Sequence, residues 1–151
     1  AKLAIGAGMK VVFSEMHDNN IDVELDFFDG QKATFTCENI GFERVLAESD
    51  FISVHVPGGN LIGDDEISKM KDGVFLMNAS RGGVVNEEAL LAAIESGKVA
   101  GAGLDVYTNE PTPAVKILMN GKVSITPHIG AATMEAQDRI GTELAAHIDA
   151  L

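Results

Sequence analysis

Gly73-Val74-Phe75-Leu76-Met77-Asn78-Ala79-Ser80-Arg81-Gly82-Gly83 is the stretch that decides the fold of this chain. Its apolar first half, residues 73–77, has the length and composition of a buried strand, and residues 84–91 predict the start of a helix. Arg81 therefore follows the carboxyl end of a strand, among small residues that let the backbone approach a ligand. Because open α/β sheets bind their ligands at that edge, the sequence predicts that Arg81 lies in a binding site.

The alternation of strand and helix continues on both sides of this stretch. Strands are predicted over residues 51–55, 74–77, 99–106 and 123–126, and helices over residues 42–48, 64–70, 87–96, 114–119 and 133–151. Asn86 and Gly97 are typical residues for the start and end of the third helix, and Thr133 is the expected N-cap of the last. That last helix carries one apolar stripe, formed by Ile140, Leu144, Ile148 and Leu151. The predicted fold class is a doubly wound, Rossmann-type parallel α/β sheet.

The first forty residues break this regular pattern. Residues 1–8 resemble the end of a helix, with Gly8 as its stop, and residues 9–14 predict a strand that ends at Glu15. Asp29-Gly30 is a strong turn signal between two strand-like arms, residues 23–28 and 32–36. The first arm alternates apolar and acidic residues, which predicts one solvated face. We expect this hairpin, about residues 22–37, to be an appendage outside the main sheet.

Composition limits the classes of partner. The chain of 151 residues has 46% hydrophobic and 23% charged residues, as in a soluble globular domain. Its net charge of −12 without a basic run makes nucleic acid an unlikely partner. No apolar run is long enough to cross a membrane, and no metal-ligand spacing is present. A single cysteine, Cys37, permits no internal disulfide and fits a cytoplasmic location.

Three ionisable residues follow the ends of three successive predicted strands: Arg81, Glu110 and His128. Because parallel strands end on one side of a sheet, these residues can meet there. A histidine can pass a proton near neutral pH, a carboxylate beside it fixes its tautomer, and an arginine binds a carboxylate in a bidentate manner. Taken singly, each has a simpler explanation: a surface arginine, a turn glutamate before Pro111, and a histidine bonded to a backbone carbonyl. Their shared placement favours a catalytic site.

Three segments carry a resemblance to a known family. Residues 78–85, 103–111 and 127–133 resemble, in order and spacing, the signatures of the D-isomer-specific 2-hydroxyacid dehydrogenases, and residues 51–56 resemble the strand before that family's cofactor loop. Within the family the likeness is greatest to the phosphoglycerate dehydrogenases, partly because of residues 130–140. The resemblance implies NAD-dependent oxidation of D-3-phosphoglycerate to 3-phosphohydroxypyruvate, a step of serine biosynthesis.

The resemblance also implies a role for each matching residue. His128 would exchange the hydroxyl proton, Glu110 would orient His128, and Arg81 would hold the substrate carboxylate. Asp105 would lie near the nicotinamide carboxamide, and Glu15 would bond the adenosine ribose, which favours NAD over NADP. His55 matches the adenine-side loop but could equally be a satisfied core histidine. The expected cofactor contacts are Glu15, His55, Val56, Pro57, Ala79, Ser80, Arg81, Asp105, His128 and Gly130.

The chain departs from the family in lacking the G-x-G-x-x-G fingerprint. We therefore expect residues 1–151 to be a truncated nucleotide-binding domain without its first strand, its glycine-rich loop or a substrate domain, and inactive alone. In the Rossmann strand order the missing strand is central. We expect strands 10–14 and 51–55 on one side of the resulting gap and the strand that begins at Val74 on the other, unless a substitute segment fills it.

Other functions stay open at this point. A hydroxypyruvate or glyoxylate reductase, or a D-lactate dehydrogenase, would carry the same three residues. The same family fold also serves as an NAD-sensing corepressor, or the chain could act only as a dimerisation module. We expect a homodimer, because relatives dimerise through this domain and the apolar stripe of the last helix suits such a contact.

Overall fold

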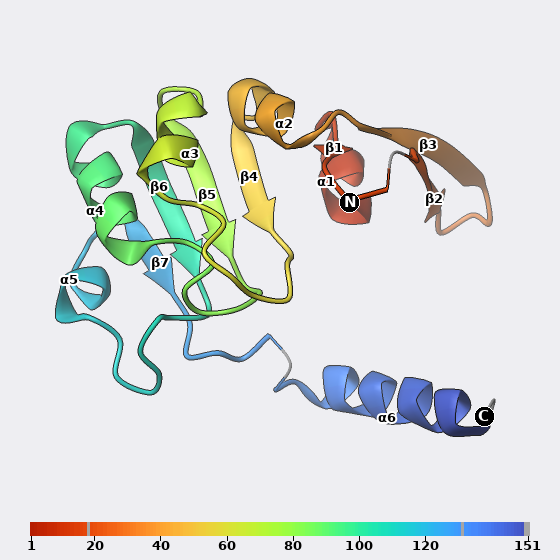
Figure 1. The fold of residues 1–151 in the computed structure, drawn as a ribbon. Helices are drawn as coiled ribbons and strands as arrows, with labels where there is room; N and C mark the ends of the chain where they lie inside the picture. Colours follow the sequence, from red (N-terminus) through yellow and green to blue (C-terminus); the bar gives the residue numbers. More distant parts are fainter. Residues whose placement is uncertain (18, 131, 150–151) are drawn as a thin grey trace. The chain divides into compact units, whose positions relative to one another are not determined.

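The computed structural model describes residues 1–17, 19–130 and 132–149 (Figure 1). The chain divides into two compact units, Ala1–Ser49 and Asp50–Leu151, and each is described by itself.

The first unit contains a three-stranded sheet. Its elements are α1 (Lys2–Gly6), β1 (Val12–Phe13), β2 (Ile21–Asp26), β3 (Lys32–Asn39) and α2 (Phe42–Glu48), and the strand order is β1-β3-β2. The predicted hairpin is confirmed, because β2 and β3 pair antiparallel around Gly30, whose φ of 81° suits glycine. Its description as an appendage is incomplete, because β3 also pairs parallel with β1. The strand predicted over residues 9–14 shrinks to the two residues that β3 pairs.

The surface of the hairpin follows the predicted alternation only in part. Glu24 and Asp26 lie on the solvated face, where Lys32 Nζ forms ion pairs with both at 2.7 and 3.1 Å. Val23 and Leu25 are half-buried, as expected for the other face. Phe27 remains 49% exposed because β2 ends one residue before it.

The second unit contains the predicted parallel sheet. Its elements are β4 (Phe51–Val54), α3 (Asp64–Lys69), β5 (Val74–Asn78), α4 (Glu87–Ser96), β6 (Val99–Leu104), α5 (Val115–Leu118), β7 (Val123–Ile125) and α6 (Met134–Asp149). The strand order is β4-β5-β6-β7, with every pair parallel. The predicted helix ends are confirmed: Asn86 Oδ1 accepts the N–H groups of Glu88 and Ala89, and Gly97 ends α4 with a φ of 82°.

The expected position of the gap in the sheet is wrong. Strand β4 pairs directly with β5, with Phe51 opposite Phe75, so these strands are neighbours and not separated by a missing strand. The physical reason is the short connection through α3, which places consecutive parallel strands side by side. Among the described residues no strand of the first sheet pairs with a strand of the second.

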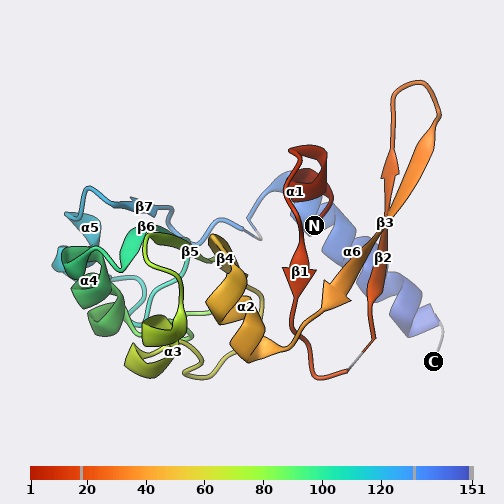
Figure 2. The same ribbon diagram turned by 90° about the horizontal axis from the view of Figure 1, so that it is seen from above.

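The two faces of the four-stranded sheet differ. Side chains on one face are buried, and Figures 1 and 2 show α3 and α4 on that side. Leu76 of β5 and Leu90 of α4 are 0% exposed there. On the other face the rings of Phe51 and Phe75 stack with centroids 5.2 Å apart but remain 53% and 40% exposed. This core holds the carboxyl ends of β5, β6 and β7 side by side.

Helix α6 begins at the predicted N-cap, because Thr133 Oγ1 accepts the N–H of Ala136 at 3.1 Å. Its apolar stripe is on the surface: Ile140, Leu144 and Ile148 are 50% to 60% exposed, and Leu151 lies outside the described residues. No helix in the described part of the chain has both the length and the apolar character needed to cross a membrane.

Candidate active site

The segment that carries Arg81 is folded by the side chain of Asn78, at the end of β5. Asn78 is 2% exposed. Its Nδ2 donates to the Arg81 carbonyl at 3.0 Å, and its Oδ1 accepts from the N–H and the hydroxyl of Ser80 at 3.1 and 2.8 Å. One buried amide therefore closes the turn and leaves Ala79 and Arg81 exposed.

The Arg81 segment touches the next strand end through Gly82. A Cβ atom on Gly82 would lie 1.8 Å from the Tyr107 carbonyl oxygen and 2.5 Å from its carbon. Only a glycine fits this contact, which explains one of the small residues beside Arg81. The backbone of Asn78 is tied to the same region, since its carbonyl accepts the N–H of Asp105 at 3.0 Å.

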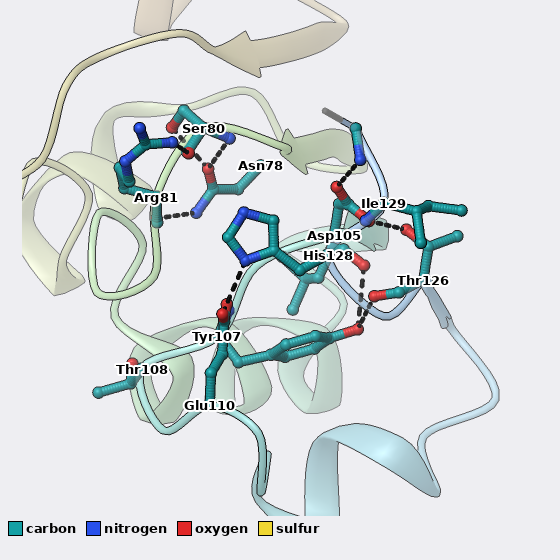
Figure 3. A network of polar contacts seen from close by, with 12 residues as sticks. Asn78, Ser80, Arg81, Asp105, Tyr107, Thr108, Glu110, Thr126, His128 and Ile129 are labelled. Atoms are coloured by element: carbon teal, nitrogen blue, oxygen red, sulfur yellow. Dashed lines mark hydrogen bonds and ion pairs between the residues drawn. The ribbon is translucent and has the colours of Figure 1, made fainter. Parts of the chain in front are cut away.

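Glu110 and His128 form an ion pair across the ends of β6 and β7 (Figure 3). His128 Nδ1 lies 2.7 Å from Glu110 Oε2, and the N–H of Tyr107 donates to Glu110 Oε1 at 2.9 Å. The bond from His128, and after it the one from Tyr107, lowers the pKa of Glu110, so this carboxyl is ionised at neutral pH. Because a carboxylate only accepts, it fixes the proton on His128 Nδ1 and leaves Nε2 for a ligand.

The backbone of His128 is in the left-handed region, with a φ of 57°. This conformation costs a residue with a Cβ roughly 1–2 kcal/mol, so neighbouring contacts must stabilise it at His128. Asp105 supplies them: Oδ1 accepts the Ile129 N–H at 2.9 Å and the Thr126 hydroxyl, and Oδ2 accepts the Gly130 N–H at 2.8 Å. The residues on both sides of His128 are therefore fastened to one carboxylate.

Asp105 is 8% exposed and still ionised. Burial acts to raise its pKa, but the hydrogen bonds from Thr126, Ile129 and Gly130 together outweigh burial and lower the pKa below its usual range. Asp105 thus already serves the segment around His128, whereas the contact with nicotinamide that the family resemblance implies stays a prediction.

Arg81 differs from the ion pair in having few partners. Its Nη1 donates to the carbonyl of Ser80 at 2.8 Å, and its side chain is exposed. Within residues 1–17, 19–130 and 132–149, no hydrogen bond or ion pair joins its guanidinium to a carboxylate. The positive charge is therefore available to an anionic ligand.

The remaining predicted cofactor residues are distributed over both units. His55, Val56 and Pro57 follow the end of β4, and His55 Nε2 lies 2.8 Å from the hydroxyl of Ser53. His55 is exposed, so its interpretation as a core histidine is wrong. Glu15 is also exposed and belongs to the first unit. In the described part of the chain, no group of three or more His, Cys, Asp or Glu side chains is arranged to hold a metal ion.

Sequence reasoning gave no role to Asn78, Tyr107 or Thr126, which organise the site. Asn78 and Tyr107 stand inside the family motifs, and Thr126 directly precedes one. Asn78 bonds within its own turn, whereas the hydroxyls of Tyr107 and Thr126 bond groups about twenty positions away in the sequence. Tyr107 did carry a signal, because a tyrosine that closely follows a buried strand needs a partner for its hydroxyl. That hydroxyl donates to the Thr126 carbonyl at 2.7 Å and lies 3.2 Å from the Leu104 carbonyl.

Comparison with known proteins agrees with this arrangement. Residues 1–130 match the family model described as D-isomer specific 2-hydroxyacid dehydrogenase, NAD binding domain. A hydroxypyruvate reductase of Thermotoga maritima is 41% identical over 95% of this chain and 45% of its own length. A D-3-phosphoglycerate dehydrogenase of Archaeoglobus fulgidus is 49% identical over 72% of this chain and 22% of its own length.

A solved structure is similar over almost the whole chain. The D-lactate dehydrogenase of Aquifex aeolicus, complexed with NAD and lactic acid, has a TM-score of 0.72 and 32% identity, over 98% of this chain and 47% of its own. The chain spans less than half the length of these three relatives. With 130 of 151 residues matched, the chain belongs to the family of NAD-binding domains of D-isomer specific 2-hydroxyacid dehydrogenases.

Proposed function

We propose that this chain supplies the catalytic groups of an NAD-dependent dehydrogenase that interconverts a D-2-hydroxy acid and its 2-oxo acid. The observation that carries the proposal is the 2.7 Å contact between His128 and Glu110. It leaves the Nε2 atom of His128 for a ligand at the sheet edge where the family binds its substrate. The neighbouring segment carries Arg81, whose guanidinium has no carboxylate partner among the described residues.

The side chains divide the reaction between them. In the oxidation direction His128 Nε2 accepts the hydroxyl proton while the carbon–oxygen double bond forms, and the ionised Glu110 stabilises the resulting imidazolium. Arg81 binds the substrate carboxylate and keeps the hydroxyl carbon in place. NAD, when bound, supplies the acceptor for the hydride that leaves that carbon. In the reverse direction His128 returns the proton to the carbonyl oxygen.

The residues present fit NAD. Ala79 and Gly130 are small, exposed residues that follow β5 and β7, so neither would obstruct a flat ring. Ser80, Asp105, Val56 and Pro57 would complete the nicotinamide and adenine sides. Glu15 would bond the ribose hydroxyls, and its charge disfavours a 2′-phosphate.

The first candidate substrate is D-3-phosphoglycerate, converted to 3-phosphohydroxypyruvate in serine biosynthesis. The 49% identity to a phosphoglycerate dehydrogenase supports it. Hydroxypyruvate is the second candidate, because the reductase of Thermotoga maritima is similar over a larger share of this chain. We further propose a cytoplasmic homodimer, supported by the free thiol of Cys37 and the exposed apolar stripe of α6.

A substrate panel on the full-length protein tests the proposal. With NAD as hydride acceptor, we expect D-3-phosphoglycerate to give the highest kcat/KM. With NADH as hydride donor, we expect the kcat/KM values for hydroxypyruvate, glyoxylate and pyruvate to be roughly tenfold lower than that value. His128→Gln should lower kcat by roughly 10²–10⁴-fold. NAD binding without turnover of any 2-hydroxy or 2-oxo acid would contradict an enzymatic role and favour the NAD-binding corepressor or dimerisation module.

A further inference from the structure

Tyr107 contacts all three segments that carry the catalytic groups. Its N–H donates to Glu110 Oε1 at 2.9 Å, its carbonyl lies against Gly82 beside Arg81, and its hydroxyl donates to the Thr126 carbonyl at 2.7 Å, two residues before His128. Figure 3 shows its ring reaching from the segment of Glu110 to the segment of His128. Resting on the proposed function, we propose that Tyr107 is the positioning residue that sets the geometry of Arg81, Glu110 and His128.

The hydroxyl of Tyr107 links its own segment to the segment of His128. Tyr107 is 6% exposed, and burial, followed by the negative charge of Asp105, raises the pKa of its hydroxyl. The hydroxyl is therefore a neutral donor at neutral pH. The N–H of Thr126 already donates to the Leu104 carbonyl at 3.0 Å, so the Tyr107 hydroxyl lies over the last hydrogen bond between β6 and β7. It donates to the carbonyl of Thr126, the residue that follows β7.

Tyr107 therefore acts through two separate sets of contacts, those of its main chain and those of its hydroxyl. The main-chain N–H and carbonyl act on Glu110 and Gly82 and would survive a change of side chain. The hydroxyl acts on the segment of His128 through the Thr126 carbonyl, and it also lies 3.2 Å from the Leu104 carbonyl. Tyr107→Phe should therefore loosen His128 against Glu110 and leave the Arg81 segment unchanged. Gly82→Ala should do the opposite, because the added Cβ moves the Arg81 segment away from the Tyr107 carbonyl.

The matched control is Ser96→Ala. The Ser96 hydroxyl donates to the Ala93 carbonyl at 3.1 Å, at the other end of α4 and away from the site. Like Tyr107→Phe, it removes one partly buried hydroxyl that serves a backbone carbonyl. A general loss of stability would appear in both variants, whereas a positioning effect would appear only in Tyr107→Phe.

The readout is the tautomer of His128. It is measured by ¹⁵N NMR of the full-length protein near pH 8.5, where an ordinary imidazole is neutral. The signal is assigned by its absence in His128→Gln. In the unmodified protein and in Ser96→Ala we expect the proton on Nδ1, as the contact with Glu110 requires. In Tyr107→Phe we expect the Nε2–H form to appear and kcat to fall roughly tenfold with KM unchanged.

An unchanged tautomer and kcat in Tyr107→Phe would overturn the proposal, as would an equal change in Ser96→Ala. A measurement on the unmodified protein does not depend on the variant folding: the Tyr107 hydroxyl proton should exchange slowly and show a nuclear Overhauser contact to the α proton of Thr126. A hydroxyl proton that exchanges too fast to be observed would also overturn it. None of these outcomes affects the dehydrogenase itself, whose failure would be seen in His128→Gln and the substrate panel.

Discussion

The segments around His128 and Arg81 reach the same edge of the sheet but are held in different ways. Residues 126–130 are fastened by side chains: Asp105 accepts three hydrogen bonds from them, and Tyr107 and Glu110 each contribute another. Residues 78–82 are shaped by their own buried Asn78 and by one close backbone contact. The Arg81 side chain, in contrast, has no carboxylate partner among the described residues.

The difference matches what each group must do. A proton-transfer group has to be in place before the reaction, because small displacements cost catalytic rate. His128 accordingly adopts a left-handed backbone conformation that its neighbours maintain. A group that binds a carboxylate can order when the ligand arrives, and a preformed partner would compete with the substrate. The fold therefore fixes His128 and leaves Arg81 available.

The largest expected effect comes from Gly82→Ala, which breaks the contact between the two segments. The new Cβ would overlap the Tyr107 carbonyl at 1.8 Å, and a backbone atom cannot move aside as a flexible side chain can. We expect a loss of about 3 kcal/mol in the free energy of unfolding, measured by denaturant titration. Gly121→Ala is the control, because its Cβ would meet nothing within 4 Å. Equal stability of the two variants would show that the close contact does not constrain the fold.

Asp105→Asn should have the next largest effect on stability, and this effect should be confined to the segment around His128. The amide keeps the shape of the carboxylate, but its NH₂ group would face an N–H donor of residue 129 or 130. One part-buried donor then loses its partner, which costs about 2 kcal/mol. Asp29→Asn is the control, because Asp29 accepts one hydrogen bond from Gln31 in an exposed turn. Thermal unfolding of both variants measures the difference, and a similar Tm would contradict the role assigned to Asp105.

Much of the fold could be predicted because its signals are local. The ends of α4 follow from Asn86 and Gly97, and the hairpin follows from Asp29-Gly30. The meeting of Glu110 and His128 follows from a general rule on parallel strands. The order of strands could not be predicted in the same way, since nothing inside residues 51–54 states which neighbour they pair with. That choice depends on the crossover through α3.

The contacts that shape the site also could not be predicted from the local sequence. Gly82 is one of sixteen glycines, and its need for a small side chain arises from a carbonyl 25 positions later in the chain. The hydroxyl of Tyr107 and the carboxylate of Asp105 bind backbone groups, which carry no sequence signature. The two-residue length of β1 likewise depends on how much of β3 runs beside it.

Arg81→Lys should have a smaller effect that appears in substrate binding and not in stability. Lysine keeps the charge but loses the planar fork that binds a carboxylate with two hydrogen bonds. For the full-length protein we expect KM for the 2-hydroxy acid to rise about tenfold, which corresponds to about 1.4 kcal/mol, with Tm unchanged. Arg44→Lys, at an exposed ion pair with Glu48 in α2, is the control. A clear loss of stability in Arg81→Lys would show that the Arg81 segment is held by its side chain after all.

The smallest expected effect is the dependence of stability on pH that arises from Glu110. Its folded pKa lies below the unfolded value of about 4.3, because of the bonds from His128 and Tyr107. The pair therefore stabilises the fold fully above that value, and the contribution disappears as the pH falls through the folded pKa. Tm measured from pH 3 to 7 should show Glu110→Gln below the unmodified protein near neutrality, with the two curves meeting in acid. Glu88→Gln, an exposed glutamate of α4, should follow the unmodified protein throughout. If the Tm curve of Glu110→Gln instead stays parallel to that of the unmodified protein down to pH 3, the ion pair orients His128 without stabilising its segment. The rigidity of that segment would then depend on Asp105 and Tyr107 alone.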